Sequence, residues 1–149
     1  MNEKKFNAIL KKEIPIAWIA GVRFHSFSDD IFKTKVELDL LNQNPFGSMF
    51  WAVEGMAAEF AGGMMLLNKI EASGKSIASL VIKNEVIFSK KAVGKIIFTC
   101  KEGKMIDAML QEAIATNSTK TFELTSIGTD EQNDVVAEFK FTWSIKIRK

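Results

Sequence analysis

The order of the predicted elements indicates an α+β fold in which a largely antiparallel, curved sheet wraps around one long helix. Six segments have strand character, one long apolar segment interrupts them after the second, and one short helical segment lies among the other four. Strands that are not separated by helices one at a time favour an antiparallel sheet. A sheet that curls around the long helix would bury that helix on most sides.

The first thirteen residues, M-N-E-K-K-F-N-A-I-L-K-K-E, predict a short amphipathic helix with Phe6, Ile9 and Leu10 on one face. This stretch is too charged to be the apolar core of a signal peptide. A single short stripe packs on the protein's own surface more often than on a membrane. We therefore expect one domain over residues 1–149, with residues 1–13 as a helical extension and no stable membrane insertion.

Two strands are expected next. The first covers Ala17 to His25 and begins after Pro15, and the second covers Ile31 to Leu38, where apolar and polar residues alternate. Between them, Ser28-Asp29-Asp30 has the composition of a turn.

The long helix is expected within the segment from Asn44 to Leu67, N-P-F-G-S-M-F-W-A-V-E-G-M-A-A-E-F-A-G-G-M-M-L-L. After its Pro/Gly turn this segment is almost wholly apolar or small, and Glu54 and Glu59 are its only charges. A helix that is apolar on all sides must be buried on all sides. A carboxylate inside it must be paired, neutralised or used, because an isolated buried charge is very costly.

Small residues in this segment indicate close packing against the sheet, since each glycine otherwise costs a helix roughly 1 kcal/mol. These residues are Gly55, Ala57, Ala58, Ala61, Gly62 and Gly63. Ser48 is expected to cap the helix N-terminus. A transmembrane span over Met49 to Leu67 is disfavoured, because its length is marginal and each glutamate would cost a few kcal/mol in a bilayer.

The rest of the chain predicts four strands and one helix. Ser73-Gly74-Lys75 ends the long helix, and the expected strands cover residues 78–88, 95–101, 121–127 and 135–147. The last strand alternates clearly, with Ala137, Phe139, Phe141 and Trp143 on its apolar side. Residues 104–116 have helical spacing, with one side formed by Met105, Met109, Leu110 and Ile114.

Composition narrows the possible functions. The net charge of +2 is too small to indicate a nucleic-acid partner. The single cysteine, Cys100, lies in an apolar strand pattern, excludes an internal disulfide framework and fits a reducing, cytoplasmic location. With His25 as the only histidine, the chain cannot form a two-histidine metal site, and no metal is expected.

From about Ile14 to Lys146 the chain resembles hotdog-fold proteins of the acyl-CoA thioesterase type. In the thioesterases of the phenylacetate pathway, the strand-to-helix junction carries an Asn. A Gly follows three residues after this Asn, His-Gly-Gly starts six residues after it, and an acidic residue lies fifteen residues after it. Here Asn44, Gly47 and Glu59 match the Asn, the Gly and the acidic residue, whereas Phe50-Trp51-Ala52 replaces His-Gly-Gly. The junction is similar also to an uncharacterised branch of this superfamily that reads N-x-x-G-S-M-x-F/W-x-A.

The resemblance implies hydrolysis of a small-molecule acyl thioester, with coenzyme A only as part of the substrate and no other cofactor. The backbone N–H groups of Trp51 and Ala52 would clamp the carbonyl oxygen. Glu59, its pKa raised by burial, would act as general base or nucleophile, and Asn44 would orient it or the water. The resemblance implies that Glu59 and Asn44 face each other between subunits of a homodimer or dimer of dimers. Substrate-binding positions would be Gly47, Phe50, Trp51 and Ala52.

Several alternatives stay open. Asn44 precedes Pro45 and fits a turn residue as well as a site residue. Glu54 lies about 140° around the helix from Glu59 and is expected to be a solvated or interface residue. Loss of His-Gly-Gly favours an alternative function, a non-catalytic acyl- or lipid-binding hotdog protein. A dehydratase or isomerase is weaker, because His25 lies outside the motif. A lysine cluster is expected to be solvated surface rather than a phosphate site, formed by Lys83, Lys90, Lys91 and Lys95.

Overall fold

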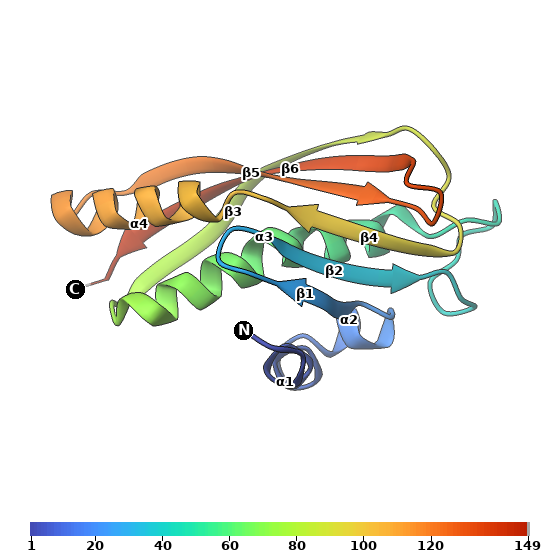
Figure 1. Ribbon diagram of the computed structural model, residues 1–149, viewed down its shortest axis with the longest axis horizontal. Helices are drawn as coiled ribbons and strands as arrows, with labels where there is room; N and C mark the ends of the chain where they lie inside the picture. Colours follow the sequence, from blue (N-terminus) through green and yellow to red (C-terminus); the bar gives the residue numbers. More distant parts are fainter. Residues whose placement is uncertain (149) are drawn as a thin grey trace.

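The computed structural model describes residues 1–148, which form a curved six-stranded sheet and four helices (Figure 1). In chain order the elements are α1 (Glu3–Glu13), α2 (Pro15–Ile19), β1 (Arg23–Phe27), β2 (Phe32–Glu37), α3 (Trp51–Ser73), β3 (Ile77–Phe88), β4 (Lys95–Cys100), α4 (Gly103–Thr116), β5 (Lys120–Thr129) and β6 (Val135–Ile147). The strand order is β1-β2-β4-β5-β6-β3, and each neighbouring pair is antiparallel. The predicted α+β hotdog architecture is confirmed.

The glycines of α3 face side chains of the sheet. A Cβ atom built on Gly55 would lie 3.5 Å from the Phe139 ring, and one on Gly62 would lie 3.1 Å from Leu124. A Cβ on Gly63 would be 2.5 Å from a carboxylate oxygen of Glu59. The small residues therefore serve close packing, as predicted, and the helix ends at Gly74, which adopts a left-handed conformation with φ of 65°.

The helix α3 is covered on most sides but not all. It packs against β2, β4, β5, β6 and α4, whereas β3 makes few contacts with it. Its buried side includes Ala57, Ala58, Ala61 and Met65, whose exposed fractions are zero. A buried hydrogen bond of 2.6 Å from the Thr34 hydroxyl to the carbonyl of Ala57 ties β2 to the middle of α3.

The N-terminal helix α1 packs on the protein itself. Phe6 and Leu10 are fully buried, and Ile9 is half-buried against the same core. The Phe6 ring lies 5.9 Å from the rings of both Phe24 and Phe32, measured between centroids. Figure 1 shows α1 and α2 beside β1 at one edge of the sheet. Burial of this apolar stripe confirms the expected amphipathic helix.

The first predicted strand begins too early. Residues 15–19 form the short helix α2, with Pro15 in its first turn, and β1 starts only at Arg23. Proline suits the first turn of a helix because its fixed φ is helical and its missing N–H has no helical partner there. Gly21, with φ of +93°, then redirects the chain into β1.

Two further local expectations are wrong. Ser48 does not cap α3; the N-cap position is Phe50, without a side-chain hydrogen bond, and Ser48 bonds to Asn44 in the preceding loop. In α4 the buried side includes Ile106, Leu110 and Ala113, whereas Met105 is 40% exposed. Ile106, Leu110 and Ala113 are spaced four and three residues apart and so lie on one side of the helix. The predicted apolar side is therefore rotated around the helix axis relative to the side that is buried.

The remaining elements follow the predicted pattern. Strands β2, β3, β4, β5 and β6 overlap their predicted ranges, and the apolar side of β6 points inward as expected. Of the described residues, no helix is both long enough and apolar enough to cross a membrane.

The glycines allow a paired test of packing. In Gly103→Ala the new Cβ would collide with the backbone of Asp29 and Asp30, which cannot rotate away, so we expect a loss of more than about 2 kcal/mol of unfolding free energy. Gly55→Ala meets only ordinary contact distances and improves helix propensity, so it should be neutral or stabilising by up to about 1 kcal/mol. Urea unfolding of both variants measures the difference, and equal effects would contradict this account of close packing.

Candidate functional site

The junction between β2 and α3 is held in place by Asn42, a residue that is 2% exposed. Its side-chain amide donates to the carbonyls of Ala20, at 3.0 Å, and Glu37, at 2.8 Å, while its carbonyl oxygen accepts from Asp39 N–H. Its own backbone carbonyl accepts from Phe50 N–H at 2.8 Å. Sequence reasoning did not single out Asn42, because its role depends on contacts with Ala20 and Glu37.

Asn44 organises the loop that follows. Its side-chain amide donates to the Ser48 hydroxyl and the Met49 carbonyl, each at 3.1 Å, and its Oδ1 accepts from Phe46 N–H at 2.9 Å. These bonds are those of an Asx turn. Gly47, with φ of +77°, completes the turn, and a Cβ there would meet no atom within 4 Å. The turn interpretation of Asn44 therefore holds within one chain.

The N-terminus of α3 opens beside this loop. Phe50 and Trp51 are 46% and 56% exposed, and Ala52 is half-buried. Among the described residues, no acceptor takes the N–H groups of Trp51 or Ala52, as is usual for the first turn of a helix. Free N–H groups and the helix dipole together favour a negative or carbonyl oxygen at this position.

A groove of about 400 Å³ adjoins this helix start, between α3 and the segment that joins β3 to β4. It is lined by Asn44, Ser48, Met49, Trp51, Glu54, Phe88, Ser89, Lys90, Lys91 and Ala92. A hydrogen bond of 2.9 Å from Met49 N–H to the Ala92 carbonyl joins its two walls. Of the predicted site residues, the groove brings together Asn44 and Trp51.

Glu59 lies elsewhere on α3. Its carboxylate sits against Gly63, close to the Trp143 ring of β6, and its side chain is half-buried. Burial raises the pKa of Glu59 to about 7, as the sequence predicted in direction. Glu59 does not line the groove that holds Asn44 and Trp51, so one chain does not bring the predicted base and clamp together.

Glu54 occupies the groove in place of Glu59. It is 4% exposed, and burial raises its pKa to about 7. Its Oε1 atom is buried with no hydrogen-bond partner among the described residues. Of the two roles expected for Glu54, a solvated residue is wrong, because packing at the start of α3 removes it from water, and an interface residue stays a prediction.

The lysines near the groove are mostly engaged. Lys90 pairs with Asp130 and, at 2.8 Å, with Asp134, while Lys91 donates to the Phe46 carbonyl at 3.0 Å. Lys83 pairs with Glu85 on the same strand at 2.8 Å. These contacts fit the expected surface role better than a phosphate site.

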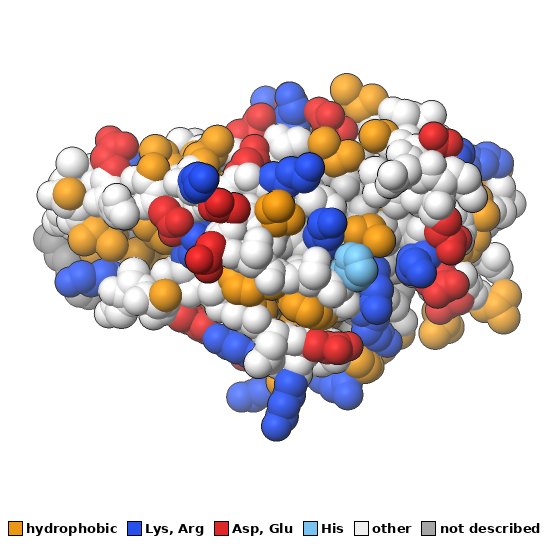
Figure 2. Space-filling model, viewed as in Figure 1, with side chains coloured by type: hydrophobic (Ala, Val, Ile, Leu, Met, Phe, Trp, Pro, Cys, Tyr) orange, Lys and Arg blue, Asp and Glu red, His pale blue; other side chains and the backbone are white. Residues whose placement is uncertain are grey.

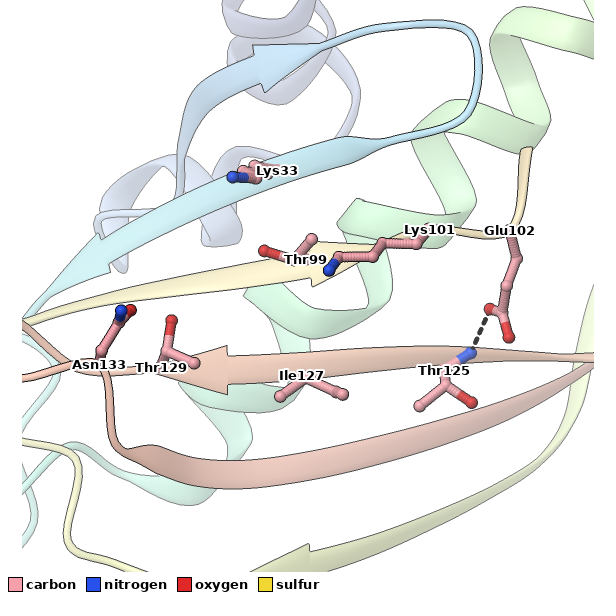
Figure 3. Close-up of a pocket in the computed structure, with 8 residues that line it drawn as sticks. All are labelled: Lys33, Thr99, Lys101, Glu102, Thr125, Ile127, Thr129 and Asn133. Atoms are coloured by element: carbon pink, nitrogen blue, oxygen red, sulfur yellow. Dashed lines mark hydrogen bonds between the residues drawn. The ribbon is translucent and has the colours of Figure 1, made fainter. Parts of the chain in front are cut away.

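A second depression, of about 410 Å³, lies across β2, β4 and β5 (Figure 3). Lys33 and Lys101 border it with a row of threonines, and its only carboxylate, that of Glu102, accepts from Thr125 N–H. None of the predicted site residues lines it. Acidic and basic side chains are interspersed on the face shown in Figure 2, so no single sign of charge dominates there. The groove at α3 is therefore the better candidate site.

Cys100 and His25 do not contribute to the groove. Cys100 is fully buried in β4, and burial raises the pKa of its thiol to about 12, so it is a core residue rather than a nucleophile. His25 lies on β1, where burial and then the nearby Lys35 lower its pKa.

Comparison with known proteins gives a family and a fold. A family model described as a domain of unknown function (DUF4442) matches residues 2–145. No curated protein matches the sequence.

Several solved structures are similar to this chain. A Pseudomonas aeruginosa protein of unknown function, named a probable thioesterase, has a TM-score of 0.85 at 21% identity, covering 99% of this chain and 97% of that one. A Haemophilus influenzae thioesterase has a TM-score of 0.75 at 15% identity, covering 99% and 92%. A mutant Pseudomonas aeruginosa thioesterase has a TM-score of 0.77 at 13% identity, covering 99% and 96%. At these identities the likeness establishes the fold alone.

The raised pKa values predict an unusual pH dependence of stability. Between pH 4.5 and about 7 the folded chain holds a proton on Glu54 that the unfolded chain has released, so unfolding free energy is lost as pH rises through this range. Between pH 5 and pH 8, we expect the unfolding free energy of Glu54→Gln to fall by on the order of 2 kcal/mol less than that of the wild type. Urea unfolding across this range, with Glu71→Gln at an exposed position of α3 as control, measures it. Superimposable profiles for wild type and Glu54→Gln would contradict the burial argument.

Proposed function

The chain belongs to the DUF4442 family, and on that premise we propose that it is a hotdog-type hydrolase of acyl thioesters such as acyl-CoA. The observation that supports this most is the start of α3, where the free N–H groups of Trp51 and Ala52 adjoin a groove on a helix that also carries the desolvated Glu59. Such N–H groups stabilise an oxyanion, and a carboxylate with a pKa near 7 is suited to proton transfer at neutral pH.

The reaction divides between these groups. Glu59 takes a proton from water, whose oxygen attacks the thioester carbon, and the carbonyl oxygen becomes an oxyanion at the Trp51 and Ala52 N–H groups. The C–S bond then breaks, the thiolate leaves, and it takes up a proton to give free acid and thiol. Coenzyme A takes part only as substrate in this scheme, and no further cofactor is required.

The separation of these groups along α3 favours a site built from two chains. Glu59 lies seven to eight residues beyond Ala52 and Trp51, or about 11–12 Å along the axis of α3. The oxyanion clamp must lie about 3 Å from the carbonyl oxygen, and the base must reach the water that attacks the carbonyl carbon. We therefore propose a homodimer in which Glu59 of one chain faces the helix start and Asn44 of the other.

The sheet has an edge that suits such a dimer. Among the described residues, β3 pairs on one side only, with β6, and leaves a twelve-residue edge unpaired. Exposed fractions along it are 64% for Leu80, 52% for Ile82 and 67% for Ile87. A long apolar edge strand is a natural association site, because its backbone groups and side chains both lack partners.

The alternative, a non-catalytic acyl-binding protein, is supported by Trp51. Its large side chain stands at the helix start where the resemblance leads us to expect glycine, and it narrows the approach to the backbone N–H groups. In that case acyl ligand would co-purify with the protein, and no thioester would be hydrolysed. A cytoplasmic location and the absence of a nucleic-acid partner stay predictions from the composition.

Hydrolysis should depend on Glu59. In a thiol-release assay over a panel of acyl-CoA chain lengths, we expect Glu59→Gln to lower kcat/KM by about 100-fold or more, since an amide cannot accept the proton. The wild-type kcat/KM should rise with pH through about 7 and then level off, because the ionised carboxylate is the active form. Glu71→Gln is the control on the same helix. Full activity in Glu59→Gln would show that another group is the base.

The dimer should depend on β3. Leu80→Lys places a charge on the exposed apolar edge, and we expect it to shift sedimentation towards monomer at concentrations where the wild type is dimeric. Ile16→Lys is the matched control, since Ile16 on α2 is 61% exposed and lies away from β3. A Leu80→Lys protein that remains as dimeric as the control would contradict pairing through this strand.

A further inference from the structure

The groove contains a carboxylate that the proposed hydrolysis does not use. Glu54 is 4% exposed, lines the groove and leaves Oε1 buried without a partner. A buried acceptor without a hydrogen bond costs free energy that most proteins avoid, so its presence calls for a physical reason.

A role in capping α3 does not supply that reason. With Phe50 as N-cap, Glu54 is the fourth residue of the helix, one position beyond the glutamate of a capping box. The Phe50 N–H that a capping glutamate would accept is already donated to the Asn42 carbonyl. The carboxyl of Glu54 is therefore free of the helix terminus.

No charged neighbour stabilises an ionised form either. From the segment joining β3 to β4, Lys90 is paired with Asp130 and Asp134, and Lys91 donates to a backbone carbonyl. The loop before α3 contributes only Asn44 and Ser48, which bond to each other, and β6 presents the uncharged Phe139 ring to this part of α3. Glu59, on the same helix, points to a different side.

The surroundings of Glu54 have the character of a ligand site. Apolar walls come from Met49, Trp51, Phe88 and Ala92. The other lining residues are polar, but Asn44, Ser48, Lys90 and Lys91 already bond to partners within the protein, so Glu54 is the buried polar group left without one. In such a setting an uncharged carboxyl group offers one O–H donor and one carbonyl acceptor. These match an uncharged amide or carbonyl group and do not match a phosphate.

We propose that Glu54 is a ligand-binding residue, whose neutral carboxyl donates a hydrogen bond to an amide oxygen of the ligand. The identity of the ligand rests on the proposed function: the segment bound in this groove is the amide-bearing arm that carries the acyl group in biological thioesters. The arm enters beside Trp51, and its amide reaches the carboxyl between the walls formed by Phe88 and Ala92. Glu54 thus recognises the carrier and takes no part in bond cleavage.

Binding of two stable probes tests the proposal. S-hexyl N-acetylcysteamine thioether carries one amide and cannot be hydrolysed, and its counterpart with an ether in place of the amide lacks the N–H and the strong acceptor. We expect calorimetry to show that Glu54→Leu lowers the affinity for the amide probe about tenfold and leaves the affinity for the ether probe nearly unchanged. Glu54→Gln, which keeps a donor, should bind the amide probe within about threefold of wild type.

The pH dependence and the stability separate this role from a structural one. Wild-type affinity for the amide probe should fall as pH rises from 6 to 8, because ionisation removes the donor, whereas Glu54→Gln should show no such fall. Glu54→Leu should melt at a higher temperature than wild type, since it removes the unpartnered oxygen. The control Glu71→Leu, on the exposed end of α3, should change neither probe's affinity.

Three results would overturn the proposal. The first is equal affinity of wild type and Glu54→Leu for the amide probe, and the second is a parallel loss of affinity for both probes together with a lower melting temperature. The third is a changed oligomeric state in Glu54→Leu, which would place the carboxyl group in a contact between subunits. The binding measurements do not require turnover. If the binding results are as expected and no thioester is hydrolysed, the proposed hydrolase function is wrong and the assignment of Glu54 as a ligand-binding residue stands.

Discussion

The close approach of the sheet to α3 is the constraint on which the rest of this structure depends. Gly62 and Gly63 leave no side chain between the helix backbone and Leu124 of β5 or Trp143 of β6, so the strands can curl over the helix. Glycine is unfavourable within a helix, and only tertiary packing offsets its cost. The helix therefore forms as part of the fold, and its hydrogen bonds and the sheet curvature stabilise each other.

That packing also determines the chemistry of the two glutamates. The same approach that buries α3 removes Glu54 almost wholly and Glu59 partly from water, and no basic side chain accompanies either one inside. Desolvation alone then raises both pKa values to about 7. Each carboxyl group sits near its titration point at neutral pH, a condition that surface carboxylates do not meet. The two groups point to different sides of the helix, as the separate roles that we propose for them require.

Incomplete coverage of α3 has a separate consequence. The sheet ends in β3, which leaves both its free edge and several apolar side chains exposed. The helix start, with its free N–H groups, and the junction loop held by Asn42 lie beside the groove. A second copy that covered the open side would complete the burial and bring a second Glu59 towards this helix start. The proposed assembly and the candidate site thus share one cause, which is that a single sheet does not fully enclose its helix.

Some of these properties follow from the sequence alone. Alternation in 32–37 and 135–147, turn residues at 28–30 and the long apolar run with its small residues each depend on neighbours along the chain, and each predicted its element correctly. The position of Asn44 in a turn was one of the two interpretations its pairing with Pro45 allowed. Local backbone chemistry determines such features, so a linear reading recovers them.

Other properties required the tertiary structure. Residues 17–19 were predicted as the start of a strand, yet they belong to α2, where Ala17 packs into the core. The spacing of Asn44 and Glu59 predicted two site residues, but spacing along a chain does not say which surfaces meet, and the groove holds Glu54 beside Asn44. The sequence determined which groups α3 carries. Only the packing of α3 against β6 and the segment 88–92 decided which carboxylate is removed from water and which groove it faces, because desolvation depends on neighbours that are remote in the chain.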